Sequence, residues 1–550
     1  MKRKCLAILL AVSMTLGLSA CGSSAATSTT GSKAAGTEAT ASAAAADSSK
    51  GGKTVVIAMG SGFSTLDPGH MYEQNPILVA NACYETLFKF ENGKDSPQPS
   101  LAQSYQFSTD GKDCTIKLNP SAKFASGNPV TSADVAFSLN RTKNLQGNPS
   151  FICANISSVE CPDGNTVVIH QKEADSALIS KLTYVACSVL DSKVVKEKGG
   201  TDAADASTAD KAQSYLDTAS AGSGMYVLKS YTADEEIVLE KNPNYYGKAT
   251  NVDKYVIKLE NDANTQMMGL SSGDLDIALN LNDDTIGELS SSSNVKTENT
   301  STKTVGFIMM NEDQKIGGPV SNVKVQQAIR DAVDYAGVQN VCGTGSITPK
   351  SIIQVGFMGS EGKLDTKTAQ NLDKAKALMK DAGYEKGFSI DMPVCELDME
   401  GIPLLDLAQK VKEDLAKINI TVNIKQQNWD GGYGDAYRSG KIGFTVMYWG
   451  IDYNDPNVQL AFLPGQEVGL RANWKADGQD AITGLYTQIL SATDNKTRSG
   501  LLTQLQDKIA DNCPFIMLSQ AACHIGYNNR LNGVTFSDTY RIDLTAVTIK

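Results

Sequence analysis

The sequence predicts an α/β protein that is divided into two or three sub-domains. Roughly 500 residues follow an N-terminal segment that resembles a targeting signal, and a chain of that length is too long for one hydrophobic core. Runs typical of strands alternate with helical patterns along this part of the chain. In the C-terminal half, two strand-like runs directly follow a helical one, which favours a lobe with an open mixed sheet.

The expected elements follow from the spacing of apolar residues. Runs of β-branched or alternating apolar residues predict strands at 53–59, 113–120, 165–172, 235–242, 252–260, 419–429 and 444–450. Apolar residues at helical spacing predict helices at 76–90, 131–141, 322–338, 373–384 and 403–418. Thr131 or Ser132 is expected to cap the second helix, because a short hydroxyl side chain accepts a hydrogen bond from the first turn.

Two glycine-flanked or small-residue joins are candidate crossings between lobes. They lie at 219–224 and at 519–522. If the chain crosses twice, its N- and C-terminal segments share one lobe, and the crossings provide a hinge.

The N-terminus has the pattern of an export signal. Lys2, Arg3 and Lys4 precede an apolar run that ends at Leu18, which is shorter than the ~20 residues of a membrane span. The following Leu-Ser-Ala-Cys resembles the bacterial lipobox, in which cleavage before the cysteine leaves a lipid-modified N-terminus. We therefore predict a signal peptide at 1–20 and a lipid on Cys21, with a plain secretory signal as the alternative.

Residues 22–52 contain no Val, Ile, Leu or aromatic residue. Such a segment has no apolar surface to offset the entropy of ordering, so 21–52 is predicted to be the lipidated cysteine and a flexible Ala/Ser/Thr/Gly linker. As a random coil it holds the following domain about 30 Å from the membrane on average. The expected location is the outer face of the bacterial cell membrane, with a lipid anchor and no membrane-spanning helix.

The charge and the cysteines limit the classes of partner. Removal of the three N-terminal cations takes the formal charge from −11 to −14, which disfavours nucleic acids and anionic membrane surfaces as partners. Eleven cysteines become nine once Cys5 and Cys21 are set aside, and none forms a C-x-x-C or another metal-like spacing. Most of the nine are expected to be small buried hydrophobes. Two pairs are close enough in sequence to bridge: Cys153 with Cys161, and Cys513 with Cys523.

No motif for catalysis is present. The chain has three histidines and lacks an H-E-x-x-H, a G-x-S-x-G elbow, a phosphate-binding P-loop and a G-x-G-x-x-G after a strand. We therefore predict a binding protein rather than an enzyme, with no cofactor and no metal site. A secreted hydrolase that uses two carboxylates is the least favoured alternative, since paired acids leave no reliable spacing.

A dense set of motifs resembles one transport family. They are "STLDPG" (64–69), "CYETLFKF" (83–90), "PQPSLAQSYQFSTDGKDCTIKL" (97–118) and "KFASGNPVTSADVAFSLNR" (123–141). Their order, spacing and residue types resemble solute-binding family 5, the oligopeptide, dipeptide and nickel receptors of ABC importers. Later matches extend the resemblance to the C-terminus: "GSGMYVLKSY" (222–231), "LEKNPNYYG" (239–247), "LSSGDLDIA" (270–278) and "NVKVQQAIRDAVD" (322–334).

The resemblance implies a periplasmic-binding-protein-like, two-lobe (venus-flytrap) fold with mixed sheets, an extra domain and a hinge between the lobes. The implied bounds are 53–88, 222–306 and 521–550 for lobe I, 89–221 for an extra domain packed on lobe I, and 307–520 for lobe II. The chain departs from the family pattern where "ASG" (125–127) replaces His-Asp-Gly and where Gln326 and Met225 replace an arginine and a proline.

The stretch "YWGIDYNDP" (448–456) resembles the Gly-Trp-x-x-Asp-Tyr-x-(Glu/Asp)-Pro of the peptide-binding members. By this resemblance Asp452 is the anchor for the α-ammonium of a peptide. Tyr448 and Gly450 offer backbone groups, and Trp449 and Tyr453 complete this part of the predicted site. Asp455, which precedes a proline, is expected to form a turn rather than to bind ligand.

Further residues complete the predicted site. All three tryptophans of the chain, Trp429, Trp449 and Trp474, lie within 46 residues, which supports a pocket in this region. A second stretch reaches the ligand in family members; it is Tyr72, Glu73 and Gln74. The carboxylate of a peptide needs a cation, and the sequence offers Arg438, Arg471 and several lysines without distinguishing them.

The implied function is capture of short di- or oligopeptides by closure of two lobes, and delivery to the transmembrane subunits of an ABC permease. The protein is expected to be a monomer. Alternatives on the same fold are a receptor for a nickel chelate, an oligosaccharide or haem, and a receptor for signalling peptides. Asp452 argues against sugars, which have no ammonium group.

Overall fold

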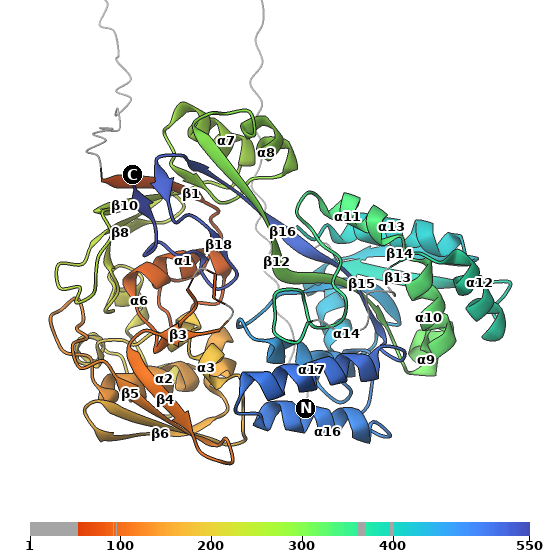
Figure 1. Cartoon of the computed structure of the whole chain (residues 1–550), viewed down its shortest axis with the longest axis horizontal. Coiled ribbons are helices and arrows are strands. Elements are labelled where there is room, and N and C mark those ends of the chain that lie inside the picture. The colour runs from red at the N-terminus through yellow and green to blue at the C-terminus, as the bar shows by residue number, and fades with distance from the viewer. Residues whose placement is uncertain (1–52, 92, 95, 361–368, 396–400) are drawn as a thin grey trace, which may run out of the picture. The chain divides into compact units, whose positions relative to one another are not determined.

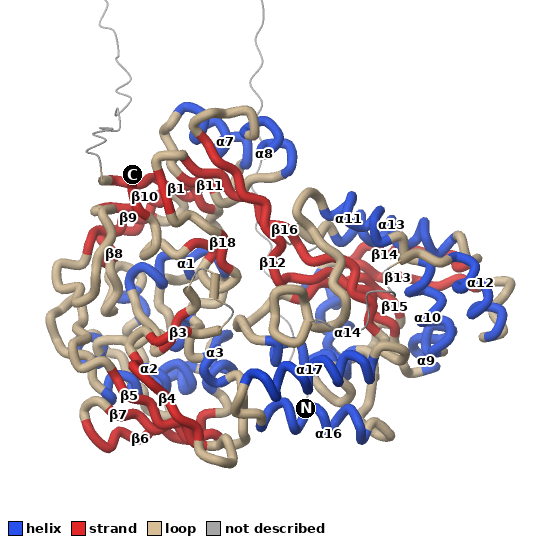
Figure 2. The backbone as a smooth tube through the Cα atoms, in the orientation of Figure 1, coloured by secondary structure: helices blue, strands red, loops and turns tan. Residues whose placement is uncertain are grey.

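An eight-stranded mixed sheet is built from strands that lie between residues 54 and 528 (Figures 1 and 2). The computed structural model describes residues 53–550 except 92, 95, 361–368 and 396–400, so the predicted signal peptide, Cys21 and the linker lie outside the described residues. The strand order is β15 (Phe444–Trp449), β12 (Val295–Met310), β16 (Phe515–Asn528), β11 (Ile277–Ala278), β1 (Thr54–Met59), β10 (Lys254–Leu259), β9 (Glu236–Lys241) and β8 (Tyr226–Thr232).

β1 pairs in parallel with β10 and β11, and the other neighbours in this sheet are antiparallel. The prediction of an α/β protein with mixed sheets is therefore confirmed.

Two large hydrophobic cores lie along this sheet. The first core takes its side chains from residues 55–279 and 523–547, and the second from 305–521. β16 passes from one core to the other, and its neighbour β12 runs from a small third cluster at Val295 to the second core. Phe515 at the start of β16 packs in the second core, whereas Ile525 near its end packs in the first. Figure 1 shows β12 and β16 side by side, from beside α7 and α8 to beside β15.

The pairing of β12 with β16 is irregular where the strands pass between the cores. The register shifts between Ser301 and Val305, opposite Gln520. The buried Gln520 amide donates to the Thr302 carbonyl at 2.8 Å, and its oxygen accepts from the Val355 N–H at 2.7 Å. The first bond satisfies a β12 carbonyl within the irregular stretch, and the second ties the loop at Val355 to β16.

The predicted crossing at 519–522 lies at this irregularity. The predicted crossing at 219–224 is wrong, because the residues before and after it belong to the same first core. Glycine is needed there for a different reason. A Cβ at Gly224 would lie 2.4 Å from the Ala82 carbonyl oxygen, so only glycine lets the two backbones approach so closely.

The first core is covered by a second sheet and by short helices. The second sheet has the order β4 (Ala102–Phe107), β5 (Asp113–Leu118), β7 (Thr166–Gln171) and β6 (Ile156–Asp163). The helices that cover the first core are α1 (Gln74–Cys83), α2 (Ser132–Leu145), η1 (Asn148–Cys153), α3 (Leu178–Lys181), η2 (Val185–Cys187), α4 (Ser192–Glu197), α5 (Ala206–Ala209) and α6 (Gln213–Leu216). Three short strand pairs complete this part of the fold. They are β2 (Phe88–Lys89) with β3 (Gln98–Pro99), β17 (Leu531–Asn532) with β20 (Thr548–Ile549), and β18 (Phe536–Ser537) with β19 (Arg541–Ile542).

A small third cluster lies under α7 (Ala263–Ser272) and α8 (Asp283–Leu289). The second core is covered by the parallel pair β13 (Phe388–Cys395) and β14 (Ile420–Gln427) and by a larger set of helices. They are α9 (Gln314–Gly317), η3 (Gly318–Ser321), α10 (Val323–Ala332), α11 (Tyr335–Cys342), α12 (Leu372–Asp381), α13 (Leu404–Ala416), η5 (Trp429–Tyr433), α14 (Gly434–Arg438), η6 (Pro456–Phe462), α15 (Glu467–Arg471), α16 (Asp480–Ser491) and α17 (Asn495–Ile509).

Two predicted helices differ from the structure. The single helix expected at 322–338 is two helices, because Asp334 begins a new one: its carboxylate accepts from the Gly337 N–H at 3.0 Å. The helix expected at 76–90 ends at Cys83, since the chain turns extended at Tyr84 and enters β2. At the second predicted helix Thr131 is the N-cap, and its N–H and hydroxyl both donate to Asp134.

The cysteine pairs that are close in sequence do not bridge. Cys153, Cys161 and Cys513 carry free thiols, so neither Cys153 with Cys161 nor Cys513 with Cys523 forms a disulfide. Cys161 is exposed, and the other eight cysteines of the described residues are buried.

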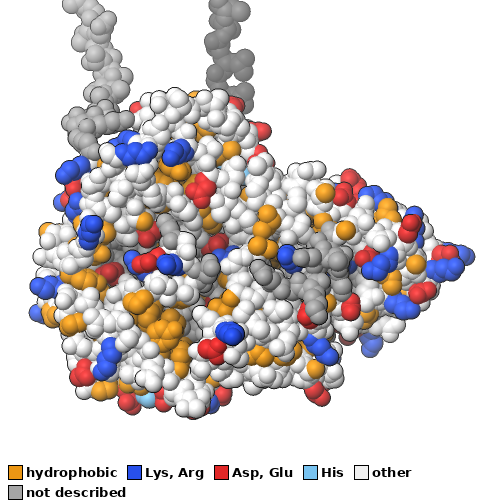
Figure 3. All heavy atoms as spheres, viewed as in Figure 1, with side chains coloured by type: hydrophobic (Ala, Val, Ile, Leu, Met, Phe, Trp, Pro, Cys, Tyr) orange, Lys and Arg blue, Asp and Glu red, His pale blue; other side chains and the backbone are white. Residues whose placement is uncertain are grey.

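The surface carries charges of both signs. Figure 3 shows Lys and Arg side chains interspersed with Asp and Glu over the visible face, with hydrophobic side chains between them. In the part of the chain that the structure describes, no helix combines the length and apolar character needed to span a bilayer.

A buried charge cluster joins two of the motifs that resemble family 5. Arg141 is fully buried, and its guanidinium binds Asp67 through two bonds of 2.9 and 2.6 Å. It also donates to Asp210 at 2.8 and 2.9 Å. Burial alone would lower the pKa of Arg141, but its bonds to the two carboxylates raise it above the ordinary value.

We predict that Arg141→Met destabilises the protein by about 3–5 kcal/mol, because two carboxylates remain buried without their cation. Urea unfolding followed by circular dichroism measures the change in the free energy of unfolding. The matched control is Lys112→Met, which removes an exposed ion pair with Glu173 at 3.1 Å and should cost less than about 1 kcal/mol. Equal losses in the two variants would contradict the role of the buried cluster.

Candidate ligand-binding site

A cavity of about 760 Å³ is lined from both cores. The side of the second core contributes the end of β15, the loop after it, η5, α14 and α15. The side of the first core contributes the start of α1, η1 and residues near 183 and 539. A volume of this size is in the range of small-ligand sites, roughly 300–1,000 Å³.

The structure brings the nine predicted ligand residues together at this cavity. They are Asp452, Trp449, Tyr448, Gly450, Tyr453, Trp429, Tyr72, Glu73 and Gln74. Contact of each with a ligand stays a prediction. Trp474 is not among the lining residues: it is 3% exposed and packs on Phe515 in the second core.

β15 brings to the cavity the residues whose backbone groups are predicted to bind a ligand. It is an edge strand of the large sheet and pairs on one side with β12, where Trp449 lies opposite Val305. Tyr448, Trp449 and Gly450 then line the cavity at the strand's end. An edge strand can add a further extended chain through its free backbone groups.

Asp452 is a carboxylate held without a cation. Its Oδ1 accepts from the Tyr72 hydroxyl at 2.7 Å, a contact between residues 380 positions apart in sequence. Burial raises the pKa of Asp452, and Glu467 raises it further, whereas the Tyr72 bond and Arg471 lower it. Among the described residues, no Lys, Arg or His lies within ion-pair distance of Asp452. Its second oxygen can therefore accept from a ligand.

The cavity's three arginines differ in what they already bind. Arg471 pairs with Glu467 and lies over the rings of Tyr437 and Trp449, at 4.9 and 5.5 Å from their centroids. Arg541 is 7% exposed and donates to the Leu279 carbonyl at 2.8 Å.

Arg438 is exposed and lies over the Trp429 ring at 4.8 Å. Within the described part of the chain, no carboxylate pairs with Arg438. The structure therefore separates Arg438 from Arg471, which the sequence left equivalent.

The comparison with known families decides the identity of the fold. The family model described as "Bacterial extracellular solute-binding proteins, family 5 Middle" matches residues 96–467, more than half of the chain. The chain belongs to this family. Family 5 consists of substrate-binding transport proteins rather than enzymes.

Relatives of the chain include two proteins of similar length. Probable D,D-dipeptide-binding periplasmic protein DdpA of Escherichia coli (strain K12) is 25% identical over 491 residues, which are 88% of this chain and 91% of that protein. Heme-binding protein A of Haemophilus influenzae is 24% identical over 474 residues, 82% of this chain and 84% of that protein.

Solved structures share the fold. HbpA2 from Haemophilus parasuis has a TM-score of 0.79 at 20% identity, covering 90% of this chain and all of that one. The ABC transporter-associated periplasmic binding protein DppA from Helicobacter pylori, in complex with peptide STSA, has a TM-score of 0.68 at 21% identity, covering 90% and 98%. The predicted periplasmic-binding-protein-like, two-lobe fold is thereby confirmed.

One wall of this cavity was not predicted. It is formed by Asn148, Phe151, Thr183 and Tyr184. The edge of the Phe151 ring packs on Tyr72, with ring centroids 6.3 Å apart. No motif distinguishes these residues in sequence, and they reach the cavity only through packing of η1 against η2.

Asp455 forms a turn, as predicted, and has a second role between the cores. It caps η6 by accepting from the Asn457 N–H at 2.9 Å, and it does not line the large cavity. Arg498 pairs with it, and the Ser180 hydroxyl from the first-core side donates to it at 2.8 Å. This buried joint therefore ties α3 to the loop that carries Asp452.

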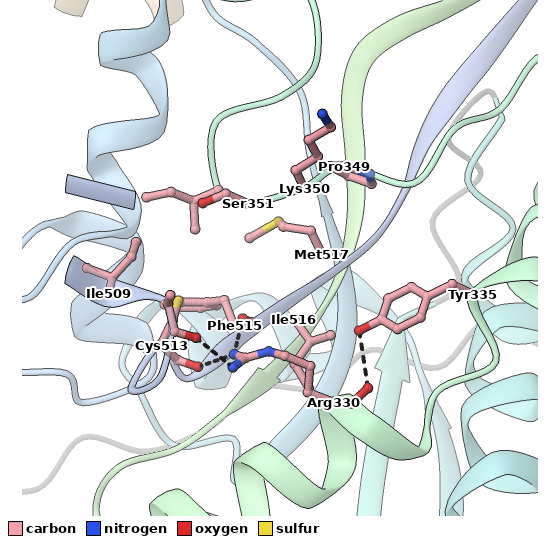
Figure 4. Close-up of a pocket in the computed structure, with 12 residues that line it drawn as sticks. Arg330, Tyr335, Pro349, Lys350, Ser351, Ile509, Cys513, Phe515, Ile516 and Met517 are labelled. Atoms are coloured by element: carbon pink, nitrogen blue, oxygen red, sulfur yellow. Dashed lines mark hydrogen bonds between the residues drawn. The ribbon is translucent and has the colours of Figure 1, made fainter. Parts of the chain in front are cut away.

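A second, smaller cavity in the second core has a structural explanation (Figure 4). Its volume is about 50 Å³, and the Arg330 guanidinium enters it. Arg330 donates to the Ala510 carbonyl at 2.9 Å and to the Cys513 carbonyl at 3.0 Å, just past the end of α17. The guanidinium therefore caps the carbonyl at the C-terminal end of α17 and binds another in the segment that follows.

The described residues contain no group of three or more His, Cys, Asp and Glu side chains arranged to hold a metal ion.

We predict that Tyr72→Phe raises the pKa of Asp452, because the lost hydroxyl favours the charged carboxylate. Carbon-13 NMR titration of the aspartate carboxyls measures the shift, and Asp452→Asn assigns the signal. Tyr105→Phe, which removes an exposed hydroxyl outside the cavity, serves as the control and should leave the pKa unchanged. An unchanged pKa in Tyr72→Phe would show that the hydroxyl does not stabilise the charge.

Proposed function

We propose that this chain is a lipid-anchored receptor that captures short peptides and delivers them to the transmembrane subunits of an ABC permease. The observation that carries the proposal is Asp452, a carboxylate with no cation partner among the described residues. It lies three residues past the edge strand β15, in a cavity lined from both cores. An α-ammonium group supplies the missing positive charge. A charge-assisted hydrogen bond of this kind contributes about 1.5–3 kcal/mol.

The edge strand accounts for binding of varied sequences. An extended peptide beside β15 bonds through its backbone at Tyr448 and Gly450, which is independent of its side chains. Trp429 and Trp449 then give broad apolar contact to those side chains.

Arg438 is our candidate for the carboxylate end of the peptide. Its guanidinium is exposed in the cavity, stacked on Trp429 and not committed to a protein carboxylate, whereas Arg471 is paired with Glu467. A guanidinium binds a carboxylate through two parallel bonds. A ligand with an ammonium at Asp452 and a carboxylate at Arg438 therefore satisfies both.

The relatives support this ligand class. They include DdpA, named as D,D-dipeptide-binding, and the Escherichia coli Dipeptide-binding protein, which is 25% identical over 463 residues. The likeness to Heme-binding protein A favours haem as the second candidate ligand. Titration with hemin, followed by the haem absorbance, tests that alternative directly.

We predict that N-acetylation of a peptide, or Asp452→Asn, weakens binding at least tenfold, or about 1.4 kcal/mol. Calorimetric titration of refolded, ligand-stripped protein with di- to hexapeptides measures the dissociation constants. Binding of free peptides should weaken as pH falls through the raised pKa of Asp452, because the protonated carboxyl has no charge for the ammonium. In Asp452→Asn this pH dependence should disappear. Equal affinity for free and acetylated peptides would rule out the anchor.

We predict that C-terminal amidation of the peptide and Arg438→Gln each weaken binding at least fivefold, and that the two together weaken it no further. Such non-additivity identifies a direct interaction. Lys441→Gln removes a nearby exposed charge that does not line the cavity and should have little effect. If Arg438→Gln weakens the free acid and the amide equally, another cation binds the carboxylate.

A further inference from the structure

Two buried cysteines meet behind one wall of the cavity. The Sγ atoms of Cys153 and Cys187 lie 3.8 Å apart, although the residues are 34 positions apart in sequence. Their exposed fractions are 0% and 2%. Each is the last residue of a short 3-10 helix, η1 for Cys153 and η2 for Cys187.

The cysteine nearest to Cys153 in sequence, Cys161, has a different contact. Cys161 is exposed, and its thiol donates to the Ser132 carbonyl at 3.2 Å. Cys153 therefore faces Cys187 in the folded chain. The fold favours this pair over the pair of Cys153 with Cys161 that was considered from the sequence.

The two 3-10 helices that end in these cysteines also build the wall. η1 contributes Asn148 and Phe151, and Thr183 and Tyr184 immediately precede η2. Phe151 packs on Tyr72, whose hydroxyl binds Asp452. A covalent bond between the ends of η1 and η2 would therefore restrict the wall that contains Phe151 and Tyr184.

α2 already holds one of these helices in place. The Thr142 hydroxyl on α2 donates to the Ala186 carbonyl at 2.7 Å, next to Cys187. A disulfide has its sulfur atoms about 2.05 Å apart, so the two Sγ atoms have to approach by about 1.8 Å from their present 3.8 Å. The Thr142 hydrogen bond thus holds the η2 backbone next to Cys187 while the two sulfur atoms approach each other.

We propose that Cys153 and Cys187 are a redox pair that forms a reversible disulfide and thereby rigidifies the cavity wall. The oxidant is an external organic disulfide. One cysteine thiolate attacks it to form a mixed disulfide and releases one thiol, and the second cysteine displaces the other thiol as the protein S–S bond forms. Two electrons and two protons pass from the protein to the two released thiols.

The compartment and the burial of the two thiols together indicate when the disulfide forms. Relatives such as DdpA are named as periplasmic proteins, and disulfides persist outside the cytoplasm. The hydrogen bond with Cys153, together with burial, raises the pKa of Cys187 well above its ordinary value, so little thiolate is present once the chain has folded. Exchange is therefore expected mainly during folding, when both thiols are exposed.

The test is to refold the reduced full-length chain in a mixture of oxidised and reduced glutathione and to map disulfides by mass spectrometry without reduction. We expect one dominant cross-linked peptide that contains Cys153 and Cys187, about 2 Da lighter than the sum of its reduced parts. Dithiothreitol should reverse it once the oxidised protein is unfolded. Hydrogen exchange of amides at 148–154 and 183–188 should slow in the oxidised protein relative to the reduced one.

Two variants control the result. Cys161→Ser removes an exposed thiol and should retain the cross-link, whereas Cys187→Ser should lose it. The comparison of oxidised and reduced wild-type protein does not depend on either variant folding. The proposal fails if wild-type protein forms no cross-link between Cys153 and Cys187, or if the cross-link forms and hydrogen exchange of the wall is unchanged. Neither outcome bears on peptide binding.

Discussion

The antiparallel pairing of β12 with β16 is the constraint on which the rest of the molecule depends. These strands are members of one sheet, and each buries its two ends in different hydrophobic clusters. The register shift lies between Ser301 and Val305, where the Gln520 side chain bonds to the Thr302 carbonyl of β12 and to the Val355 N–H of a neighbouring loop. The ligand cavity exists only because this pair holds β15 and its following loop opposite the start of α1.

The loop after β15 shows how the surroundings give two aspartates different chemistry. Asp455 is saturated by Arg498, Ser180 and a backbone N–H, so its charge is fully used within the protein. Asp452, three residues earlier, accepts from a tyrosine hydroxyl, and no cation among the described residues lies within ion-pair distance of it. The first aspartate stabilises a contact between the cores, and the second keeps the charge that we propose a ligand ammonium binds.

Sequence alone could predict the features that depend on neighbouring residues. The strand at 53–59 and the turn at Asp455 follow from local pattern, whereas the site at Tyr448 to Asp452 was predicted from its resemblance to family 5. The wall at Phe151 and Tyr184 and the approach of Cys153 to Cys187 depend on packing of segments more than 30 residues apart, for which a single sequence carries no periodic signal.

The pairing of Arg471 with Glu467 was a missed local signal. The two residues are four apart, the spacing at which opposite charges meet on one helix face. The break at Asp334 was missed for a similar reason, because a capping aspartate within an apolar repeat resembles an ordinary polar position.

The Tyr72 hydroxyl binds one oxygen of Asp452 and leaves the other for a ligand in the proposed site. A neutral donor at that second oxygen adds only a hydrogen bond of the kind that Tyr72 already makes. A cationic donor adds the attraction of opposite charges to its hydrogen bond, and this attraction is stronger in a partly buried site than in water. With one oxygen already satisfied by Tyr72, the proposed site therefore distinguishes ligands by their charge as well as by their hydrogen bonds.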